Sequence, residues 1–219
     1  MELKERGVLC SKNRIANIIK KNNLVAKRRK KWKGKRLVTK EKKLNLLNQD
    51  FKAEKKNANW VSDITYIRTG KGWAYLCTVM DLYSRKIVGH SIKKHMKKEL
   101  VMQALEQAIA RRGSVNGIIF HSDQGSQYGS ETVEESLKRN KMLGSMSGKG
   151  SCYDNAPMER FFNSLKRECI GTEIFKDVET AEKEIFSYIE CYYNNKRKHS
   201  TLGYLSPVKF EEKHENSLC

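Results

Sequence analysis

Three apolar segments follow one another closely between Trp60 and Ile92, and they restrict the fold more than any other feature of the sequence. The segments WVSDITYIRT, WAYLCTVMDL and KIVGHSI are rich in β-branched and aromatic residues, and Gly70 to Gly72 supplies a turn between the first two. Segments of this kind joined by short turns predict neighbouring strands. We therefore expect a three-stranded antiparallel meander.

The rest of the chain alternates between helical and strand patterns. Pro157 suits the first turn of a helix, with Asp154 or Asn155 as its cap, because a proline there loses no hydrogen bond. The predicted elements after the meander are a helix over 97–112, a strand over 118–120, a helix over 131–141, a strand over 142–146, a helix from Pro157 and a helix over 177–193. This order predicts an α/β fold with a mixed five-stranded sheet flanked by helices.

Positive charge is concentrated at the N-terminus. The chain has a formal net charge of +19, from 44 Lys and Arg against 25 Asp and Glu. Residues 1–59 contain 20 of the Lys and Arg but 5 of the Asp and Glu, so most of the excess lies there. A charge excess of this size favours a polyanionic partner, with nucleic acid ahead of an anionic membrane.

Other sequence features argue against several classes of protein. No segment approaches the roughly 20 apolar residues that a membrane-spanning helix needs, and the first residues lack the apolar stretch of a signal peptide. The six cysteines include no CxxC pair, so a zinc site is not expected. We therefore expect a cytoplasmic protein without membrane contact.

The basic N-terminal part contains the first candidate DNA contacts. A helix is predicted over 11–23, capped by Ser11, with Lys12 and Arg14 on its polar face. The run KRRKKWKGKR follows over residues 27–36, and a short helix is predicted over 39–51. We expect the run to contact phosphates, although it could also be a solubilising linker. Its candidate DNA-binding residues are Arg28, Arg29, Lys30 and Lys31.

Three acidic residues occupy informative places. Asp63 lies in the first predicted strand, Asp123 directly follows the fourth, and Glu159 lies in the first turn of a later helix. Ligand sites of α/β sheets gather at strand ends and helix starts. A cluster of carboxylates selects hard cations such as Mg²⁺ or Mn²⁺. Two such ions about 4 Å apart can promote phosphodiester chemistry, so the three residues together are candidate catalytic metal ligands. Each of them alone would also fit a turn, a cap or a helix-dipole partner.

The helix that carries Glu159 has two faces. Met158, Phe161, Phe162 and Leu165 share the spacing of a buried stripe. Glu159 and Lys166 fall on a polar stripe, roughly 10 Å apart along the helix axis. Such a stripe suits a metal at one end and a DNA backbone beyond it, so Lys166 is a candidate DNA contact; a solvated helix face would have the same pattern.

The words WVSDITYI, FHSDQGSQY and SGKGSCYDNAPMERFFNSLKRE resemble the integrase core of bacterial insertion-sequence transposases. The resemblance is to the larger product of two-reading-frame elements, which is related to retroviral integrases. That family places 35 residues between its second Asp and its Glu, as residues 124–158 do here, and a basic residue seven positions later, matched by Lys166. The tail YIECYYNNKRKHSTLGYLSP and the first 36 residues are also similar to the family.

The resemblance implies a domain plan with an RNase H-like core. Residues 1–36 would be a partial helix-turn-helix with a basic arm, 37–58 a linker helix, 59–170 the catalytic core, and 171–219 a C-terminal helix and basic tail. In the tail, Arg197 is a candidate DNA contact, with a solvated tail as the alternative.

The resemblance also implies an activity. The protein would cleave and transfer DNA strands with two Mg²⁺ ions, which Mn²⁺ could replace, at the terminal inverted repeats of a mobile element. Its partners would be double-stranded repeat and target DNA, other copies of itself, and the smaller product of the upstream frame. It would act in the bacterial cytoplasm, at the nucleoid.

Two other functions remain open at this stage. The family has more helix-turn-helix sequence than precedes Met1 here, so a catalytically inactive or truncated DNA-binding remnant is one alternative. An RNase H-like nuclease or Holliday-junction resolvase is the other, because it would share the metal chemistry without strand transfer.

Overall fold

The computed structural model of the chain describes residues 6–24, 44–148 and 152–215. Two compact units are distinguished, residues 1–35 and 36–219. In the first unit, α2 (Lys12–Lys21) begins where the Ser11 hydroxyl accepts a hydrogen bond from the Arg14 amide, which confirms the predicted cap. Among the described helices, none combines the length and apolar character needed to cross a lipid bilayer.

The second unit is built on one five-stranded sheet. The strands are β1 (Asn59–Thr69), β2 (Gly72–Asp81), β3 (Ile87–Lys93), β4 (Ile119–Ser122) and β5 (Leu143–Met146). Their order across the sheet is β3-β2-β1-β4-β5. The first three strands pair antiparallel, whereas β4 is parallel to β1 and β5 is parallel to β4. Both the predicted meander and the mixed five-stranded sheet are confirmed.

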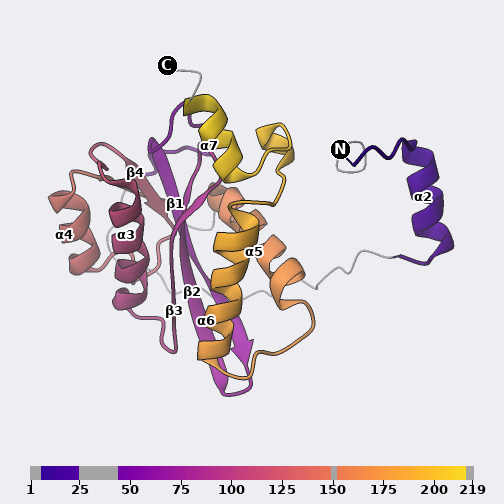
Figure 1. The fold of residues 1–219 in the computed structure, drawn as a ribbon. Coiled ribbons are helices and arrows are strands. Elements are labelled where there is room, and N and C mark those ends of the chain that lie inside the picture. The colour runs from indigo at the N-terminus through magenta and orange to yellow at the C-terminus, as the bar shows by residue number, and fades with distance from the viewer. Residues whose placement is uncertain (1–5, 25–43, 149–151, 216–219) are drawn as a thin grey trace. The chain divides into compact units, whose positions relative to one another are not determined.

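Helices cover both faces of this sheet (Figure 1). On one face, α3 (Lys98–Arg112) and α4 (Glu131–Arg139) bury a core with Trp60 of β1 and Val79 of β2. On the other face, α5 (Ala156–Leu165) and α6 (Val178–Ser187) bury a second core with Val61 and Leu76. Neighbouring residues of a strand point to opposite faces, so Trp60 and Val61 enter different cores.

Both α5 and α6 continue as wider helical turns. The turn η2 (Lys166–Ile170) follows α5, and η3 (Tyr188–Tyr193) follows α6. Ile170 and Ile189 are buried in the same core as the helices before them. The C-terminal segment therefore belongs to the compact body of the second unit.

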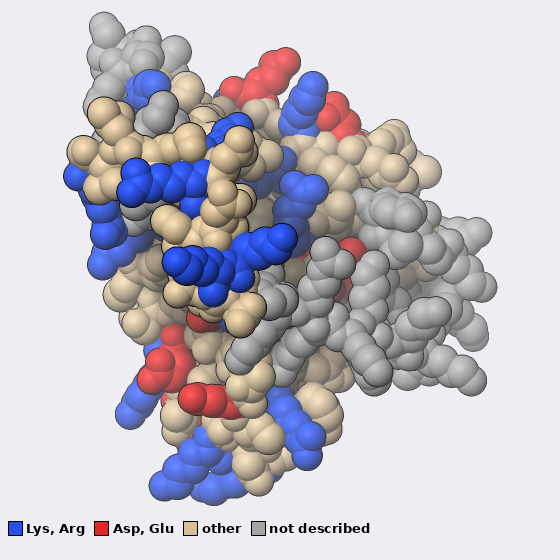
Figure 2. Space-filling model, turned by 90° about the vertical axis from the view of Figure 1, so that its right-hand side faces the viewer, with Lys and Arg blue, Asp and Glu red and all other residues tan. Residues whose placement is uncertain are grey.

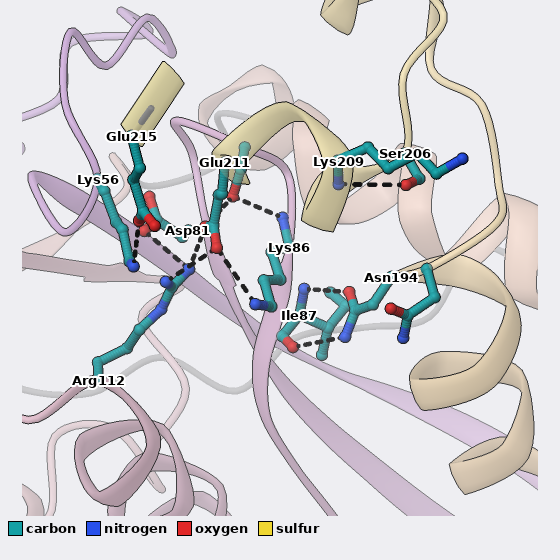
Figure 3. Close-up of polar contacts among 12 residues, drawn as sticks. Lys56, Asp81, Lys86, Ile87, Arg112, Asn194, Ser206, Lys209, Glu211 and Glu215 are labelled. Atoms are coloured by element: carbon teal, nitrogen blue, oxygen red, sulfur yellow. Dashed lines mark hydrogen bonds and ion pairs between the residues drawn. The ribbon is translucent and has the colours of Figure 1, made fainter. Parts of the chain in front are cut away.

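Buried polar contacts attach the last helix to the sheet. The basic tail contains a short turn, η4 (Ser200–Leu202), and α7 (Pro207–Glu215). Figure 3 shows the Arg112 guanidinium between the carboxylates of Glu211 on α7 and Asp81 on β2. Glu211 also accepts hydrogen bonds from Ser84 at 2.6 Å and Lys86 at 3.2 Å. These contacts make α7 a folded part of the unit.

The predicted helix over 39–51 is wrong for its described residues. Residues 44–58 form bends and turns, and residues 37–43 lie outside the described part of the chain. The backbone of Asn48 and Gln49 has φ of 43° and 63°, which interrupts a right-handed helix. The Met146 amide instead donates to the Leu44 carbonyl, and the Leu46 amide donates to the Ser145 hydroxyl. This segment, which was expected to belong to a linker helix, thus forms hydrogen bonds to the end of β5 in place of hydrogen bonds within a helix.

Candidate active site

The parallel pairing of β1 with β4 brings two of the three predicted carboxylates together. In this pairing Asn59 lies opposite Ile119, Trp60 opposite Phe120, and Val61 opposite His121. Each pair is sixty positions apart, and the same offset relates Asp63 to Asp123, which directly follows the last residue of β4. Neighbouring strands are about 4.8 Å apart. The backbones of Asp63 and Asp123 therefore lie at adjacent positions, just beyond the region in which β1 and β4 pair.

Local hydrogen bonds orient both carboxylates. The Ile64 amide donates to Asp63 Oδ1 at 2.8 Å, and the Gly125 amide donates to Asp123 Oδ1 at 3.0 Å. Asp63 is 9% exposed and shares the face of β1 with Val61, the face that α5 and α6 cover. A Cβ atom at position 125 would lie 2.9 Å from Asp123 Oδ1. Glycine at this position therefore leaves the space that the Asp123 carboxylate uses.

A buried polar cluster on the opposite face of β1 was not predicted. The hydroxyls of Ser62 and Tyr128 are 2.8 Å apart, and each lies 3.6 Å from the thiol of Cys77. The pKa of Cys77 is raised to about 12, mainly by burial; the hydrogen bonds with Ser62 and Tyr128 oppose this rise, and the charges of Asp63 and Asp123 add to it. Tyr128 lies in the segment FHSDQGSQY, the part of the sequence that could have indicated this cluster.

Two residues before α5 fix the start of that helix. The Asn155 side chain donates to the Ser62 carbonyl of β1 at 3.0 Å. The buried Asp154 carboxylate accepts hydrogen bonds from Asn45, Gln49 and the Gly148 amide. Asn155 is the N-cap residue, which confirms the predicted position of the cap, although its side chain makes no cap hydrogen bond. The side chains of Asp154 and Asn155 instead connect α5 to neighbouring segments, which local sequence does not reveal.

Glu159 lies on the exposed side of α5. It is exposed in the first turn of α5, while Met158 and Phe161 on the predicted apolar stripe are buried. Within residues 6–24, 44–148 and 152–215, no three His, Cys, Asp or Glu side chains form a group that could hold a metal ion. Asp63, Asp123 and Glu159 therefore do not form such a group in this structure, although the register of β1 with β4 sets the two aspartates at neighbouring positions. Lys166 is half-buried at the junction of α5 and η2.

His121 has a structural environment. Its ring is fully buried, and Nδ1 lies 2.8 Å from the Ser145 hydroxyl on β5. Burial lowers its pKa, against the opposing effect of Asp154 and Asp123. The histidine therefore links β4 to β5 as a neutral hydrogen-bonding group.

The predicted DNA-binding residues have different environments. Lys12 and Arg14 are exposed on α2, and the basic residues Arg28 to Lys31 lie outside the described residues. On the face that Figure 2 shows, Lys and Arg side chains are prominent among the residues that are coloured.

Arg197 is engaged within the fold. Its Nε donates to Glu168 Oε2 at 2.8 Å, and its Nη2 donates to Glu168 Oε1 at 2.9 Å. The two side chains are 20% and 23% exposed. This two-pronged ion pair joins the basic tail to η2, a role that the sequence did not indicate.

Comparison with protein families places integrase sequence along most of the second unit. A model described as "Integrase core domain" matches residues 53–152, and a second model with the same description matches residues 159–214. The first match contains Asp63 and Asp123, and the second begins at Glu159.

Curated relatives come from bacterial insertion sequences. Transposase InsF of insertion sequence IS3A from Escherichia coli K12 is 49% identical over 169 residues, which are 77% of this chain and 59% of InsF. The chain thus spans less than two thirds of the length of InsF. A 31 kDa protein of insertion element IS600 from Shigella sonnei is 38% identical over 215 residues, which are 97% of this chain and 79% of that protein.

Solved structures share the fold at low sequence identity. A chain of the simian T-cell lymphotropic virus intasome, solved in complex with a regulatory subunit of PP2A, has a TM-score of 0.58 and 14% identity; the match covers 92% of this chain and 67% of that chain. The catalytic core domain of BIV integrase has a TM-score of 0.53 and 17% identity, covering 74% of this chain and 97% of the domain. The sheet and its flanking helices thus form the RNase H-like fold of retroviral integrase cores.

Proposed function

Since the chain belongs to the insertion-sequence transposases that carry an integrase core, we propose that it is a polynucleotidyl transferase acting on DNA. In this proposal it cleaves a strand at the terminal inverted repeats of a mobile element and joins the released 3′ end to target DNA. It acts as a homo-oligomer on double-stranded DNA in the bacterial cytoplasm, at the nucleoid, with the smaller product of the upstream frame as a further partner.

One observation carries the catalytic part of this proposal. The constant offset of sixty residues between β1 and β4 relates Asp63 to Asp123 at one end of two neighbouring strands. We assign these two carboxylates as metal ligands, and Glu159 in the first turn of α5 as the third ligand. Lys166, beyond Glu159 on the same helix, is assigned to the DNA backbone.

The donor atoms fit a magnesium site. Carboxylate oxygens are the ligands of hard cations such as Mg²⁺ and Mn²⁺. The amides of Ile64 and Gly125 hold Oδ1 of each aspartate, and Gly125 leaves room for the Asp123 carboxylate. Two bound Mg²⁺ ions would activate the attacking oxygen and stabilise the leaving oxygen.

The protein's own groups keep this site in place. Asn155 ties the start of α5 to β1 beside Asp63, and Asp154 ties it to residues 45–49 and to Gly148. The catalytic helix therefore has a fixed origin relative to the two aspartates. Fixed positioning of ligands is what metal-dependent strand cleavage requires.

The test uses the full chain, a labelled duplex that ends in an inverted repeat, and Mg²⁺, Mn²⁺ or EDTA. Asp63→Asn, Asp123→Asn and Glu159→Gln should each reduce cleavage and joining by about a thousandfold, since several kcal/mol of charge stabilisation are lost. DNA binding in EDTA should be unchanged. Asp50→Asn and Glu182→Gln, which alter exposed acids in the same way, are the matched controls and should retain activity.

Each other outcome has a definite meaning. Product formation by Asp123→Asn would remove that residue from the site. DNA binding without a nicked product under either ion would favour the inactive remnant over the enzyme. Nicked DNA without joined DNA would favour an RNase H-like nuclease.

A further inference from the structure

A cationic cleft lies beside α5, on the part of the unit formed with η3 and the basic tail. It has a volume of about 400 Å³. Arg85, Arg160, Arg197 and Lys198 contribute to its walls together with His199, and among the described residues that line it none is Asp or Glu. A cleft of this size can hold a group as large as a nucleotide.

Two buried nitrogens of the cleft residues have no hydrogen-bond partner in the described part of the chain. They are Nη1 of Arg85 and Nε2 of His199. The other terminal nitrogen of Arg85 donates to the Phe51 carbonyl at 3.1 Å, which holds the guanidinium in place. Nη1 of Arg85 is necessarily a donor, and a buried donor without a partner is costly, so an acceptor oxygen of a ligand that reached it would lower that cost.

The charges in the cleft point to an anionic ligand. Burial lowers the pKa of Arg85, and the charge of Arg160 lowers it further, although Tyr193 and Asp81 oppose this. Burial also lowers the pKa of His199 to about 4, with the charges of Arg197 and Arg85 adding to the effect. Arg197 has Glu168 as its counter-ion. An anion in the cleft would offset the repulsion between Arg85 and Arg160.

We propose that this cleft binds one backbone phosphate of the DNA strand, with its nucleotide against the rings of Phe51 and Tyr204. The proposal rests on the proposed function, because it assumes a DNA substrate. A phosphodiester supplies both the negative charge and the acceptor oxygens, and arginine forks match its geometry. The uncharged aromatic rings of Phe51 and Tyr204 suit contact with a sugar or a base.

The position of the cleft suggests how the strand runs. Arg160, which lines the cleft, follows Glu159 directly, so these two side chains leave α5 at positions about 100° apart around the helix axis. A strand that crosses this turn would be held by the cleft on one side while it reaches the carboxylates on the other. The cleft would thereby set which phosphodiester arrives at the metal site.

The first experiment measures binding of a fluorescein-labelled duplex to the full chain in EDTA, over a series of NaCl concentrations. Arg160 is exposed, so Arg160→Ala should fold normally. It should weaken binding about tenfold and reduce the slope of log K against log salt by about one. Arg139→Ala removes the same charge from the exposed end of α4, on the opposite face of the sheet, and should leave both quantities near the wild-type values.

The second experiment uses the His199 ring as a reporter of the cleft. Thymidine 3′,5′-bisphosphate should shift the imidazole C2–H resonance of His199 and raise its pKa in the wild-type chain, but not in Arg160→Ala. The imidazole resonance that is missing from the spectrum of His199→Gln is assigned to His199.

Several results would overturn the proposal. Equal effects of Arg160→Ala and Arg139→Ala on DNA binding would do so, as would an unchanged His199 resonance with saturating bisphosphate. An equal shift with inorganic phosphate at the same concentration would reduce the cleft to a simple anion site. Failure of the proposed function would look different: strand cleavage would be missing while the cleft variant still weakened DNA binding.

Discussion

Truncation of Glu211 to alanine should destabilise the second unit strongly. The Arg112 and Glu211 side chains are each 5% exposed, and Asp81 is fully buried. Removing the Glu211 carboxylate leaves Arg112 in a buried site with Asp81 Oδ2 at 3.3 Å as its remaining acidic neighbour. Breaking a buried ion pair by removing one partner costs about 3–5 kcal/mol. A loss of this size is a large part of the roughly 5–15 kcal/mol that stabilises a typical protein.

Urea unfolding followed by tryptophan fluorescence measures the effect. With a urea dependence of about 2 kcal/mol per molar, the unfolding midpoint of Glu211→Ala should fall by about 2 M. Glu212→Ala is the matched control, because Glu212 is the next residue of the same helix and is exposed. The control should change the free energy of unfolding by about 0.5 kcal/mol or less. Equal midpoints for the two variants would refute the claim that this carboxylate anchors α7.

The pH dependence gives a second check of the same contact. Burial alone would raise the pKa of Glu211, but Arg112, Ser84 and Lys86 lower it below its usual value. A carboxyl whose pKa is lowered in the folded state stabilises the fold above its unfolded pKa of about 4.3. That contribution is lost as pH falls through the folded pKa. The difference in stability between wild type and Glu211→Ala should therefore shrink in strong acid.

Two further predictions concern packing and titration. Gly89→Ala should lower the free energy of unfolding by about 1–3 kcal/mol, since a Cβ there would lie 2.1 Å from the Ala104 carbonyl oxygen of α3; thermal unfolding measures this. The pKa of His199 is lowered to about 4, so the unfolded chain binds the proton more readily and stability should fall as pH drops from about 6.5 towards that value. His199→Gln should reduce this loss of stability, which urea unfolding midpoints at neutral and acidic pH measure. The same pH profile in the variant and the wild type would contradict the reasoning.

Patterns within single segments predicted most of the fold. The meander, the helix over 97–112 and the apolar stripe of α5 depend on local spacing of apolar residues, and all three are present. The sequence also indicated Asp63 within one strand and Asp123 directly after another. The sheet order was needed to see that β1 and β4 are neighbours with a constant offset.

Contacts between distant segments account for what the sequence did not reveal. A segment rich in charged residues has the composition of a solvated tail. Glu is rarely buried unless it is paired, so the sequence offered no reason to expect that Glu211 is buried. The partner of Glu211 is Arg112, 99 residues earlier, so no local pattern could show the pair. The same holds for Asp154, whose hydrogen bonds reach back to Asn45 and Gln49. These bonds also explain why residues 44–51 turn instead of forming a helix.

The parallel pairing of β1 with β4 has a consequence for the order of folding. The meander can form from neighbours along the chain, whereas β1 and β4 meet after closure of a loop of sixty residues. Contacts between distant segments form late, because the entropy of closing the loop opposes them. A partly folded chain would hold Asp63 in its hairpin with no Asp123 beside it. The proposed metal site would then arise together with the completed sheet.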